Sequence, residues 1–359
     1  WSRRALNWNG TTGICAASLG RHKMLARTVI IPAKGRAEVV EEELDTSHLQ
    51  PNEAIIQAEA SMISAGTELS RVFEIKKGFS YPVRPGYSAV GKVLAKGDGL
   101  TDLQVGDRVF YTGPHASVCR FSRGNRTQGP MIFKLPEGIG AQEGSLITLA
   151  LVAISGVNSV EVRLGDRIGV FGMGMIGLLA ALMLKKLGAE VVAIDPVVER
   201  CAQAQQMGIT QIVDCPAEEQ LAQIQARIGG LDAAVDVTGA ARAIETAVLT
   251  CKKYGQVTLL GTPRAACTMD VTPTLNAIHM RMLRVIGAFN SLEPVFESEG
   301  MRMNVARDFE TVCGMILSRE LPVSRLISHV IAPEEAERAY HGLMFEPDLY
   351  HCVVIDWSK

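Results

Sequence analysis

Short runs of apolar residues alternate with longer segments of helical periodicity throughout the second half of the chain. Such runs fit buried strands, and their alternation with helices is typical of a parallel, doubly wound sheet. The pattern predicts strands at Arg167–Phe171, Glu190–Ile194, Gln211–Val213, Ala233–Val237, Gln256–Leu260 and Leu283–Phe289. It predicts helices at Val198–Met207, Ala217–Ile228 and Ala241–Lys253.

The first part of the chain has a different pattern. Between Leu25 and Lys134, short β-rich stretches are separated by Gly, Pro and Asp, which predicts a small, partly open β-barrel. A helical segment at Ala141–Val160 leads from it into the parallel sheet. In the C-terminal segment from residue 305 onward, the pattern predicts helices at Val305–Ser318 and Glu334–Phe345 and a strand at His351–Trp357. We therefore expect two domains, a barrel domain of residues 24–150 and 290–359 and an inserted sheet domain of residues 151–289.

A glycine-rich turn follows the first strand of the parallel sheet. It reads Gly172-Met173-Gly174-Met175-Ile176-Gly177 and opens an Ala/Leu-rich helix, and the next strand ends in Asp195. Gly172 permits a tight turn, Gly174 lets a pyrophosphate approach the backbone, and Gly177 lets the helix lie close to the strand. The helix N-terminus offers amide donors to phosphate. These six residues and Asp195 are predicted to bind a dinucleotide; the alternative is a turn in an ordinary α/β domain.

The nicotinamide end of such a cofactor is expected beyond the carboxyl ends of the later strands. Small and polar residues occur there, and we expect cofactor contacts from Thr238, Gly261, Thr262, Ala288 and Phe289.

The acidic side chain of Asp195 favours NAD over NADP. It accepts hydrogen bonds from the ribose and repels a 2′-phosphate. Arg200, on the following helix, is expected to contact the adenosine side, which leaves NADP open as an alternative.

Composition and charge narrow the classes of partner. The chain has 359 residues and a net charge of -2, so it lacks the basic footprint expected of a protein that binds nucleic acid or an anionic membrane. No apolar run is long enough for a membrane span. The eight cysteines are dispersed without C-x2-C pairs, which favours a reducing, cytoplasmic setting. A small-molecule partner is the expectation.

Residues 1–23 are expected to lie outside the fold. They contain four arginine or lysine residues, no acidic residue and no continuous apolar core of a signal peptide. We interpret them as an extension, disordered or non-native, upstream of a start at Met24; an organellar transit segment is the alternative.

Several motifs resemble the medium-chain dehydrogenase/reductase superfamily, the alcohol and polyol dehydrogenase group. They are ISAGTELS (residues 63–70), RPGYSAVGKV (84–93), VGDRVF (105–110), the glycine turn, VDVTG (235–239) and HVIAPEEAERAYHGL (329–343). The resemblance covers Met24 to Trp357. It implies a GroES-like catalytic domain, a Rossmann domain, an NAD(P)-dependent oxidoreductase acting on CH-OH groups, and a homodimer.

The chain departs from the family at its zinc ligands. Zinc-dependent members carry Cys-Gly-Thr-Asp where this chain has Ala65-Gly66-Thr67-Glu68, and Gly-His-Glu where it has Gly86-Tyr87-Ser88. The third ligand position falls on or beside Thr148, and the lobe for a structural zinc is missing. A catalytic zinc needs three Cys, His or carboxylate ligands, so no zinc is expected. The chain resembles the zinc-free branch, including bacterial sugar, cyclitol and bacteriochlorophyllide dehydrogenases.

Without zinc, side chains must move the substrate proton. Tyr87 is the leading candidate, because a phenol donates a proton and, once ionised, accepts one. The alternative is that Tyr87 only fills the volume that the metal vacates. Thr67 matches a hydroxyl that relays the proton in relatives, against a turn hydroxyl that caps backbone. Glu68 matches an acid that orients the site, with a buried structural pairing as the alternative.

Three further hydroxyls are predicted to contact the substrate. Ser88 and Thr148 are expected to line its pocket, and Ser70 lies where relatives often carry a relay histidine, with a solvated loop serine as the alternative. His115 precedes a barrel strand and is expected to make a strand-end hydrogen bond rather than to act in catalysis.

Three functions remain open at this point. The first is an NAD-dependent, zinc-independent dehydrogenase for a secondary alcohol or ketone of a polyol, cyclitol or sugar-like molecule. The second is a zinc-free quinone or enone reductase using NAD(P)H. The third is a catalytically silent nucleotide-binding protein.

Overall fold

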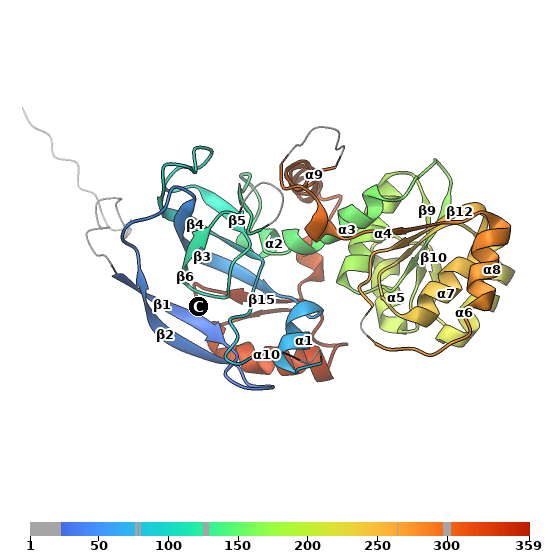
Figure 1. Cartoon of the computed structure of the whole chain (residues 1–359), viewed down its shortest axis with the longest axis horizontal. Coiled ribbons are helices and arrows are strands. Elements are labelled where there is room, and N and C mark those ends of the chain that lie inside the picture. The colour runs from blue at the N-terminus through green and yellow to red at the C-terminus, as the bar shows by residue number, and fades with distance from the viewer. Residues whose placement is uncertain (1–22, 76–77, 79, 125–128, 264, 297–302) are drawn as a thin grey trace, which may run out of the picture.

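The computed structural model describes residues 23–75, 78, 80–124, 129–263, 265–296 and 303–359. A barrel-like β-region lies at one end and a parallel sheet flanked by helices at the other (Figure 1). This confirms the partly open barrel and the doubly wound sheet. The expected extension lies outside the described residues except for Lys23, with which the first strand begins.

The barrel region contains a two-stranded antiparallel sheet and a seven-stranded sheet. The smaller sheet pairs β1 (Lys23–Ile30) with β2 (Glu38–Asp45). The larger has the order β14-β15-β3-β4-β5-β7, with β6 paired to β3. Its strands are β3 (Glu53–Ile63), β4 (Ala89–Lys96), β5 (Arg108–Tyr111), β6 (Val118–Ser122), β7 (Ile132–Lys134), β14 (His329–Ile331) and β15 (Val353–Asp356). The C-terminal strands therefore complete a sheet that the first third of the chain begins.

Short helices close this region. They are α1 (Thr67–Val72), α2 (Ala141–Gly144), α9 (Val305–Leu317), α10 (Ala336–Phe345) and the 3-10 turns η2 (Val323–Leu326) and η3 (Pro333–Glu335). The helix expected at Ala141–Val160 is divided into α2 and α3 (Ile147–Asn158). Nearly every residue of α3 is buried, because it packs on both α4 and α9 and lies between the two regions.

The second region is a six-stranded parallel sheet of order β10-β9-β8-β11-β12-β13. Its strands are β8 (Arg167–Phe171), β9 (Glu190–Ile194), β10 (Gln211–Val213), β11 (Leu231–Asp236), β12 (Cys251–Leu259) and β13 (Arg284–Gly287). Its helices are α4 (Met175–Lys186), α5 (Val198–Gln206), α6 (Ala217–Ile228), α7 (Ala241–Thr250) and α8 (Thr272–Arg281), and η1 (Asn290–Leu292) follows the last strand.

Alternating strand residues face the two layers of helices. On β9, Val191 and Ala193 belong to the core shared with α3, α4 and α5, whereas Val192 and Ile194 pack with α6 and α7. Every second side chain of a strand points to the same face, so a strand covered on both faces must be apolar throughout. This explains why unbroken apolar runs predicted these strands.

Two differences from the expected elements have local causes. The helix predicted to run to Lys253 ends at Thr250, because β12 begins at Cys251. The sequence pattern did not predict α8, since Ala277 is its only buried residue and it carries little apolar periodicity. None of the helices in the described ranges combines the length and apolar character that a bilayer crossing requires.

Gly177 sets the distance between α4 and the turn after β8. A Cβ atom built at this position would lie 1.8 Å from the carbonyl oxygen of Gly172, so any larger residue forces helix and turn apart. We expect Gly177→Ala to lower the free energy of unfolding by about 3 kcal/mol, the upper range for overpacking a tight site. Denaturant titration measures it.

Gly314→Ala is the matched control. Gly314 is also inside a helix, α9, but nothing lies within 4 Å of the Cβ it would gain. This variant should keep or slightly raise stability. Equal stability of the Gly177→Ala and wild-type proteins would contradict the close approach.

Candidate functional site

A cleft of about 1080 Å³ lies between the barrel region and the parallel sheet. On the sheet side it is lined by the turn after β8 and by residues that follow β9, β11, β12 and β13. On the barrel side it is lined by the end of β3, the start of α1, the segment before β4 and the loop between α10 and β15. The carboxyl ends of parallel strands are where open α/β sheets bind ligands.

Most of the predicted site residues meet in this cleft. Its lining includes all predicted cofactor contacts and three of the six predicted catalytic or substrate contacts. They are Thr67, Tyr87, Thr148, Gly172, Met173, Gly174, Met175, Ile176, Gly177, Asp195, Arg200, Thr238, Gly261, Thr262, Ala288 and Phe289. Residues widely separated in sequence therefore come together around one space.

The glycine turn has the shape that a pyrophosphate needs. Gly172 has a φ of 97°, in the region that favours glycine, and its missing Cβ makes room for Thr238. Gly174 is the N-cap of α4, and nothing lies within 4 Å of where its Cβ would be. A phosphate can therefore approach the backbone of Gly174 and the amide groups of the first helical turn.

Asp195 is nearly buried, with 3% of its surface exposed, and holds the glycine turn. Its Oδ2 accepts a hydrogen bond from the backbone N–H of Met173 at 2.7 Å, and its Oδ1 accepts one from Val197 at 2.8 Å. The guanidinium of Arg200 lies 3.7 Å from Oδ2. Each carboxylate oxygen can accept a further bond, so these contacts orient Asp195 and are compatible with a ribose partner.

Asp236, at the end of β11, holds the neighbouring turn in a similar way. It accepts hydrogen bonds from the backbone N–H and hydroxyl of Thr238 and from the N–H of Gly239. Burial raises the pKa of this carboxyl. Gly261 packs so closely on this turn that its Cβ would lie 2.3 Å from the nitrogen of Gly239. Asp236 was not predicted as a site residue, although its place at a strand end is similar to that of Asp195.

By the resemblance, two of the zinc-ligand positions of relatives hold Ala65 and Tyr87, and the third falls on or beside Thr148. All three line the cleft. The Tyr87 phenol donates a hydrogen bond to the Ser64 hydroxyl at 2.5 Å, and the buried Thr148 hydroxyl has no partner among the described residues. An alanine supplies no ligand, and a neutral phenol and an alcohol are not among the usual donors to Zn²⁺. These residues do not fit a catalytic zinc.

Within the described ranges of the chain, no three His, Cys, Asp or Glu side chains are grouped so that they could hold a metal ion.

Glu68 does not lie where it could touch a substrate, so its predicted part in catalysis is limited to holding other residues in place. Its carboxyl group is 2% exposed and lies outside the cleft lining. It accepts hydrogen bonds from the Tyr340 hydroxyl at 2.6 Å and the Ser64 backbone N–H at 2.9 Å, and His115 Nε2 lies 3.0 Å away. The alternative of a buried structural pairing therefore applies. His115 is also part of the buried structure. Both of its ring nitrogens have partners, Ser61 and Glu68, where one hydrogen bond at a strand end was expected.

Ser88 and Ser70 also lie outside the cleft lining, so the structure does not bring these two predicted substrate contacts to the space where a substrate would bind. The buried Ser88 hydroxyl donates to the Ser145 carbonyl at 2.5 Å. Neighbouring residues of an extended segment point to opposite sides, which places Tyr87 in the cleft and Ser88 behind it. The Ser70 hydroxyl donates to the carbonyl of Thr67 at 2.8 Å, a bond to the preceding helical turn.

Ser64 and Arg71 are among the cleft residues that were not predicted from the sequence. Ser64 stands next to Ala65 in the ISAGTELS motif and Arg71 directly follows that motif, and both line the cleft. Arg71 lies four residues after Thr67 on α1, hence on the same helical face. That spacing was a signal available from sequence.

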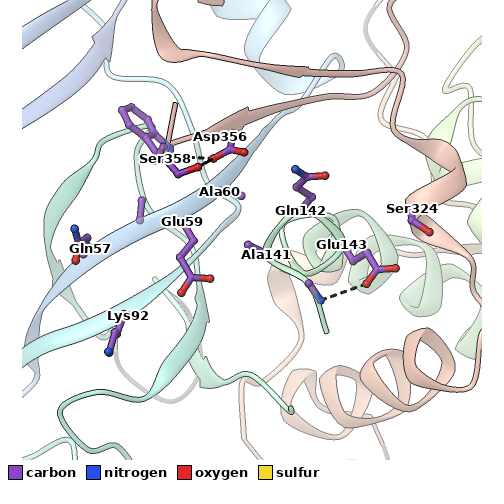
Figure 2. Close-up of a pocket in the computed structure, with 13 residues that line it drawn as sticks. Gln57, Glu59, Ala60, Lys92, Ala141, Gln142, Glu143, Ser324, Asp356 and Ser358 are labelled. Atoms are coloured by element: carbon purple, nitrogen blue, oxygen red, sulfur yellow. Dashed lines mark hydrogen bonds between the residues drawn. The ribbon is translucent and has the colours of Figure 1, made fainter. Parts of the chain in front are cut away.

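A second hollow, of about 640 Å³, lies against the barrel sheet beside α2 (Figure 2). Its three carboxylates already have partners within the protein: Glu59 with Arg108, Glu143 with Arg319, and Asp356 with Ser358. None of the predicted site residues lines it. The cleft between the two regions is therefore the candidate active site.

Comparisons with known proteins agree with this architecture. A family model described as "Alcohol dehydrogenase GroES-like domain" matches residues 50–161, and one described as "Zinc-binding dehydrogenase" matches residues 176–301. The chain is 29% identical over 202 residues to (R,R)-butanediol dehydrogenase of Bacillus subtilis (strain 168), a match that covers 50% of this chain and 58% of that protein.

Two further matches extend over nearly the whole length of the similar protein. The chain is 27% identical over 351 residues to L-threonine 3-dehydrogenase of Vibrio cholerae, covering 88% of this chain and 95% of that one. Its fold is similar to the crystal structure of galactitol-1-phosphate dehydrogenase from Escherichia coli, with a TM-score of 0.79 and 22% identity over 92% of this chain and 99% of that one. The chain belongs to the medium-chain dehydrogenase/reductase superfamily, whose members are NAD(P)-dependent, as an alcohol dehydrogenase-like oxidoreductase.

Proposed function

We propose that the protein is an NAD-dependent dehydrogenase that works without zinc and interconverts a secondary alcohol and a ketone in a polyol, cyclitol or sugar-like substrate. One observation carries this proposal. The cleft holds a dinucleotide turn opposite a hydrogen-bonded tyrosine, Tyr87, and an unpartnered buried hydroxyl, Thr148, at or beside two positions where relatives bind zinc.

The sheet side of the cleft supports NAD as the cofactor. The backbone of the glycine turn is open toward the space where a pyrophosphate would lie, and Asp195 is fixed beside it. The carboxylate disfavours a 2′-phosphate because like charges repel at short range. Bound nicotinamide supplies the hydride acceptor or donor. Gly239 and Gly261 keep the turns beyond β11 and β12 close together on that side.

The barrel side supports proton transfer by a side chain. In relatives, zinc acts as a Lewis acid on the substrate oxygen, and here a donor must take that role. Tyr87 lines the cleft and its hydroxyl is held by Ser64, which orients the phenol oxygen so that it can take a proton from the substrate oxygen or return one. Thr67 lines the same space from the first turn of α1.

Thr148 supports a hydroxylated substrate. A buried hydroxyl without a partner is costly, and a substrate hydroxyl in the cleft would satisfy it. The polar residues Thr112, Asn290 and Ser291 also line the cleft. A quinone or enone offers only carbonyl oxygens, which can accept a bond from Thr148 but can donate none to the other polar groups of the cleft.

We also propose a homodimer that works in a reducing, cytoplasmic setting. The edge strand β13 exposes its side chains, and exposed apolar residues lie nearby at Leu275, Met280 and Met282. Exposed apolar patches mark association surfaces. The seven cysteines in the described ranges are all free, which agrees with a reducing compartment.

Turnover and metal content measured on one purified sample test the proposal. We expect NAD to be reduced with at least one member of a panel of polyols, cyclitols and sugars, and zinc to be far below one per chain. Light scattering on the same sample should give twice the chain mass. About one zinc per chain in active protein would refute zinc independence. Turnover with enones or quinones alone would identify a reductase, and nucleotide binding without any turnover a silent binder.

Tyr87→Phe tests the proton-transfer role. The phenylalanine keeps the ring and removes the hydroxyl, so we expect kcat to fall by about 10²-fold, the lower range for losing a general acid or base. The pH dependence of kcat should flatten as well. A near-normal kcat with an unchanged pH profile would mean that Tyr87 only fills space.

Asp195→Ala tests the cofactor preference. Losing a ribose contact should weaken NAD binding about tenfold, since one hydrogen bond to a charged group is worth about 1.5 kcal/mol. NADP binding should weaken less, because the repulsion of its phosphate is also removed. Calorimetric titration with both nucleotides measures this. Arg200→Ala is the opposing control and should weaken the binding of NADP more than that of NAD. If Asp195→Ala weakens the binding of both nucleotides equally, Asp195 does not contact the ribose.

A further inference from the structure

Ser64 is the direct partner of the Tyr87 phenol. It follows the last residue of β3, is 4% exposed, and lines the cleft. Its hydroxyl oxygen lies 2.5 Å from that of Tyr87. The contact joins two segments of the barrel, the end of β3 and the segment before β4, at the point where the substrate would meet the phenol.

The backbone of Ser64 is held from behind the cleft. Its N–H donates to the Glu68 carboxyl at 2.9 Å, and the same carboxyl is bonded to Tyr340 of α10 and to His115. Glu68 therefore binds the main-chain amide of Ser64 and not its hydroxyl, and the hydroxyl pairs with Tyr87.

The chain of hydrogen bonds continues from His115 into the barrel core. His115 Nδ1 lies 2.8 Å from the Ser61 hydroxyl, which accepts a bond from the indole N–H of Trp357 at 2.9 Å. Glu68, His115, Tyr340 and Ser61 are each at most 2% exposed. An indole N–H can only donate, so the Ser61 oxygen is an acceptor and its own proton is available to His115. The position of Ser64 is thus set by buried groups that cannot turn toward water.

A hydroxyl suits this position because it both donates and accepts. When Tyr87 carries its proton, the phenol donates to Ser64. When Tyr87 has lost its proton, the Ser64 hydroxyl can rotate its hydrogen and donate to the phenolate, with no movement of heavier atoms. A hydrogen bond to the charged form of an acid favours that form.

We propose that Ser64 is a positioning residue of the reaction, which orients the Tyr87 phenol and donates a hydrogen bond to its phenolate, and that the buried Glu68 and His115 pair holds Ser64 in place. This inference rests on the proposed function, since it takes Tyr87 as the proton-transfer group. In the oxidation direction, the substrate O–H proton passes to the phenolate oxygen, the C–H electron pair leaves with the hydride to nicotinamide, and the C=O bond forms. The phenol later releases its proton to solvent.

The first test follows ionisation of the phenol without any substrate. Ultraviolet absorbance of tyrosinate is recorded against pH for each protein, and the matching protein that also carries Tyr87→Phe is subtracted to isolate Tyr87. We expect Ser64→Ala to move the midpoint of this titration upward by about one pH unit, the effect of losing one hydrogen bond to a charged group. Ser64→Thr, which keeps a hydroxyl, should restore the wild-type midpoint.

Ser70→Ala is the matched control, because its hydroxyl only bonds the carbonyl of Thr67 and lies outside the cleft lining. It should leave the midpoint unchanged. Thermal unfolding of each variant checks that the fold persists; if Ser64→Thr does not fold, Ser64→Cys replaces it, and its weaker donor should give an intermediate midpoint. An unchanged midpoint in folded Ser64→Ala would overturn the inference.

The second test uses kinetics with an alcohol that the wild-type protein oxidises. Ser64→Ala should lower kcat about tenfold at neutral pH with little change in KM, and raising the pH should recover most of the loss. A loss that is the same at every pH would indicate a merely structural role and overturn the inference. If the wild-type protein oxidises no alcohol, the proposed function fails on its own, while the titration still reports whether Ser64 and Tyr87 act as a pair.

Discussion

The buried carboxyl group of Glu68 organises the barrel side of the cleft. A carboxyl group removed from water is costly unless hydrogen bonds satisfy it, and here partners come from three separate segments: Tyr340, His115 and the backbone of Ser64. These bonds tie α10, the loop before β6 and the end of β3 to the first turn of α1. Two side chains that line the cleft are held in this way, because Thr67 begins α1 and the hydroxyl of Tyr87 is bonded to Ser64. Glu68 therefore acts on the site without touching the space inside it.

The cofactor side uses carboxylates in a related way. Asp195 follows β9 and Asp236 ends β11, two strands that lie on either side of β8 in the sheet. Each binds the backbone N–H groups of a turn that lines the cleft. Without these hydrogen bonds the backbone amides of each turn would bind water instead, and the turn would not keep one conformation. At Gly177 and Gly261 the absence of a Cβ atom lets two backbone segments pack directly against each other. The fixed turns then leave the cleft beside them open for a ligand. Both halves of the cleft are thus pre-formed by buried acids.

At and beside the positions that hold zinc ligands in relatives, this chain presents hydroxyl groups to the cleft. A metal would polarise the substrate oxygen from one point, whereas Tyr87, Ser64 and Thr148 offer hydroxyl groups spread along the cleft wall. Hydroxyls donate and accept, so they can follow a proton as it moves between substrate and protein. That Ala65 has no atom able to bind a metal follows from the sequence. The pairing of Tyr87 with Ser64 follows only from the fold.

The sequence alone determined the parallel sheet, the glycine turn with Asp195, and the lack of usual zinc donors at Ala65 and Thr148. These depend on local rules, such as apolar runs in strands buried on both faces and glycines where no Cβ fits. It did not predict α8, whose single buried residue leaves no apolar periodicity, although a crossover between β12 and β13 requires a connecting segment. It also assigned Glu68, Ser70 and Ser88 to the cleft. Only the tertiary structure decided which way those side chains point, because their partners, such as Tyr340 and Ser145, are brought to them by packing between segments far apart in the chain.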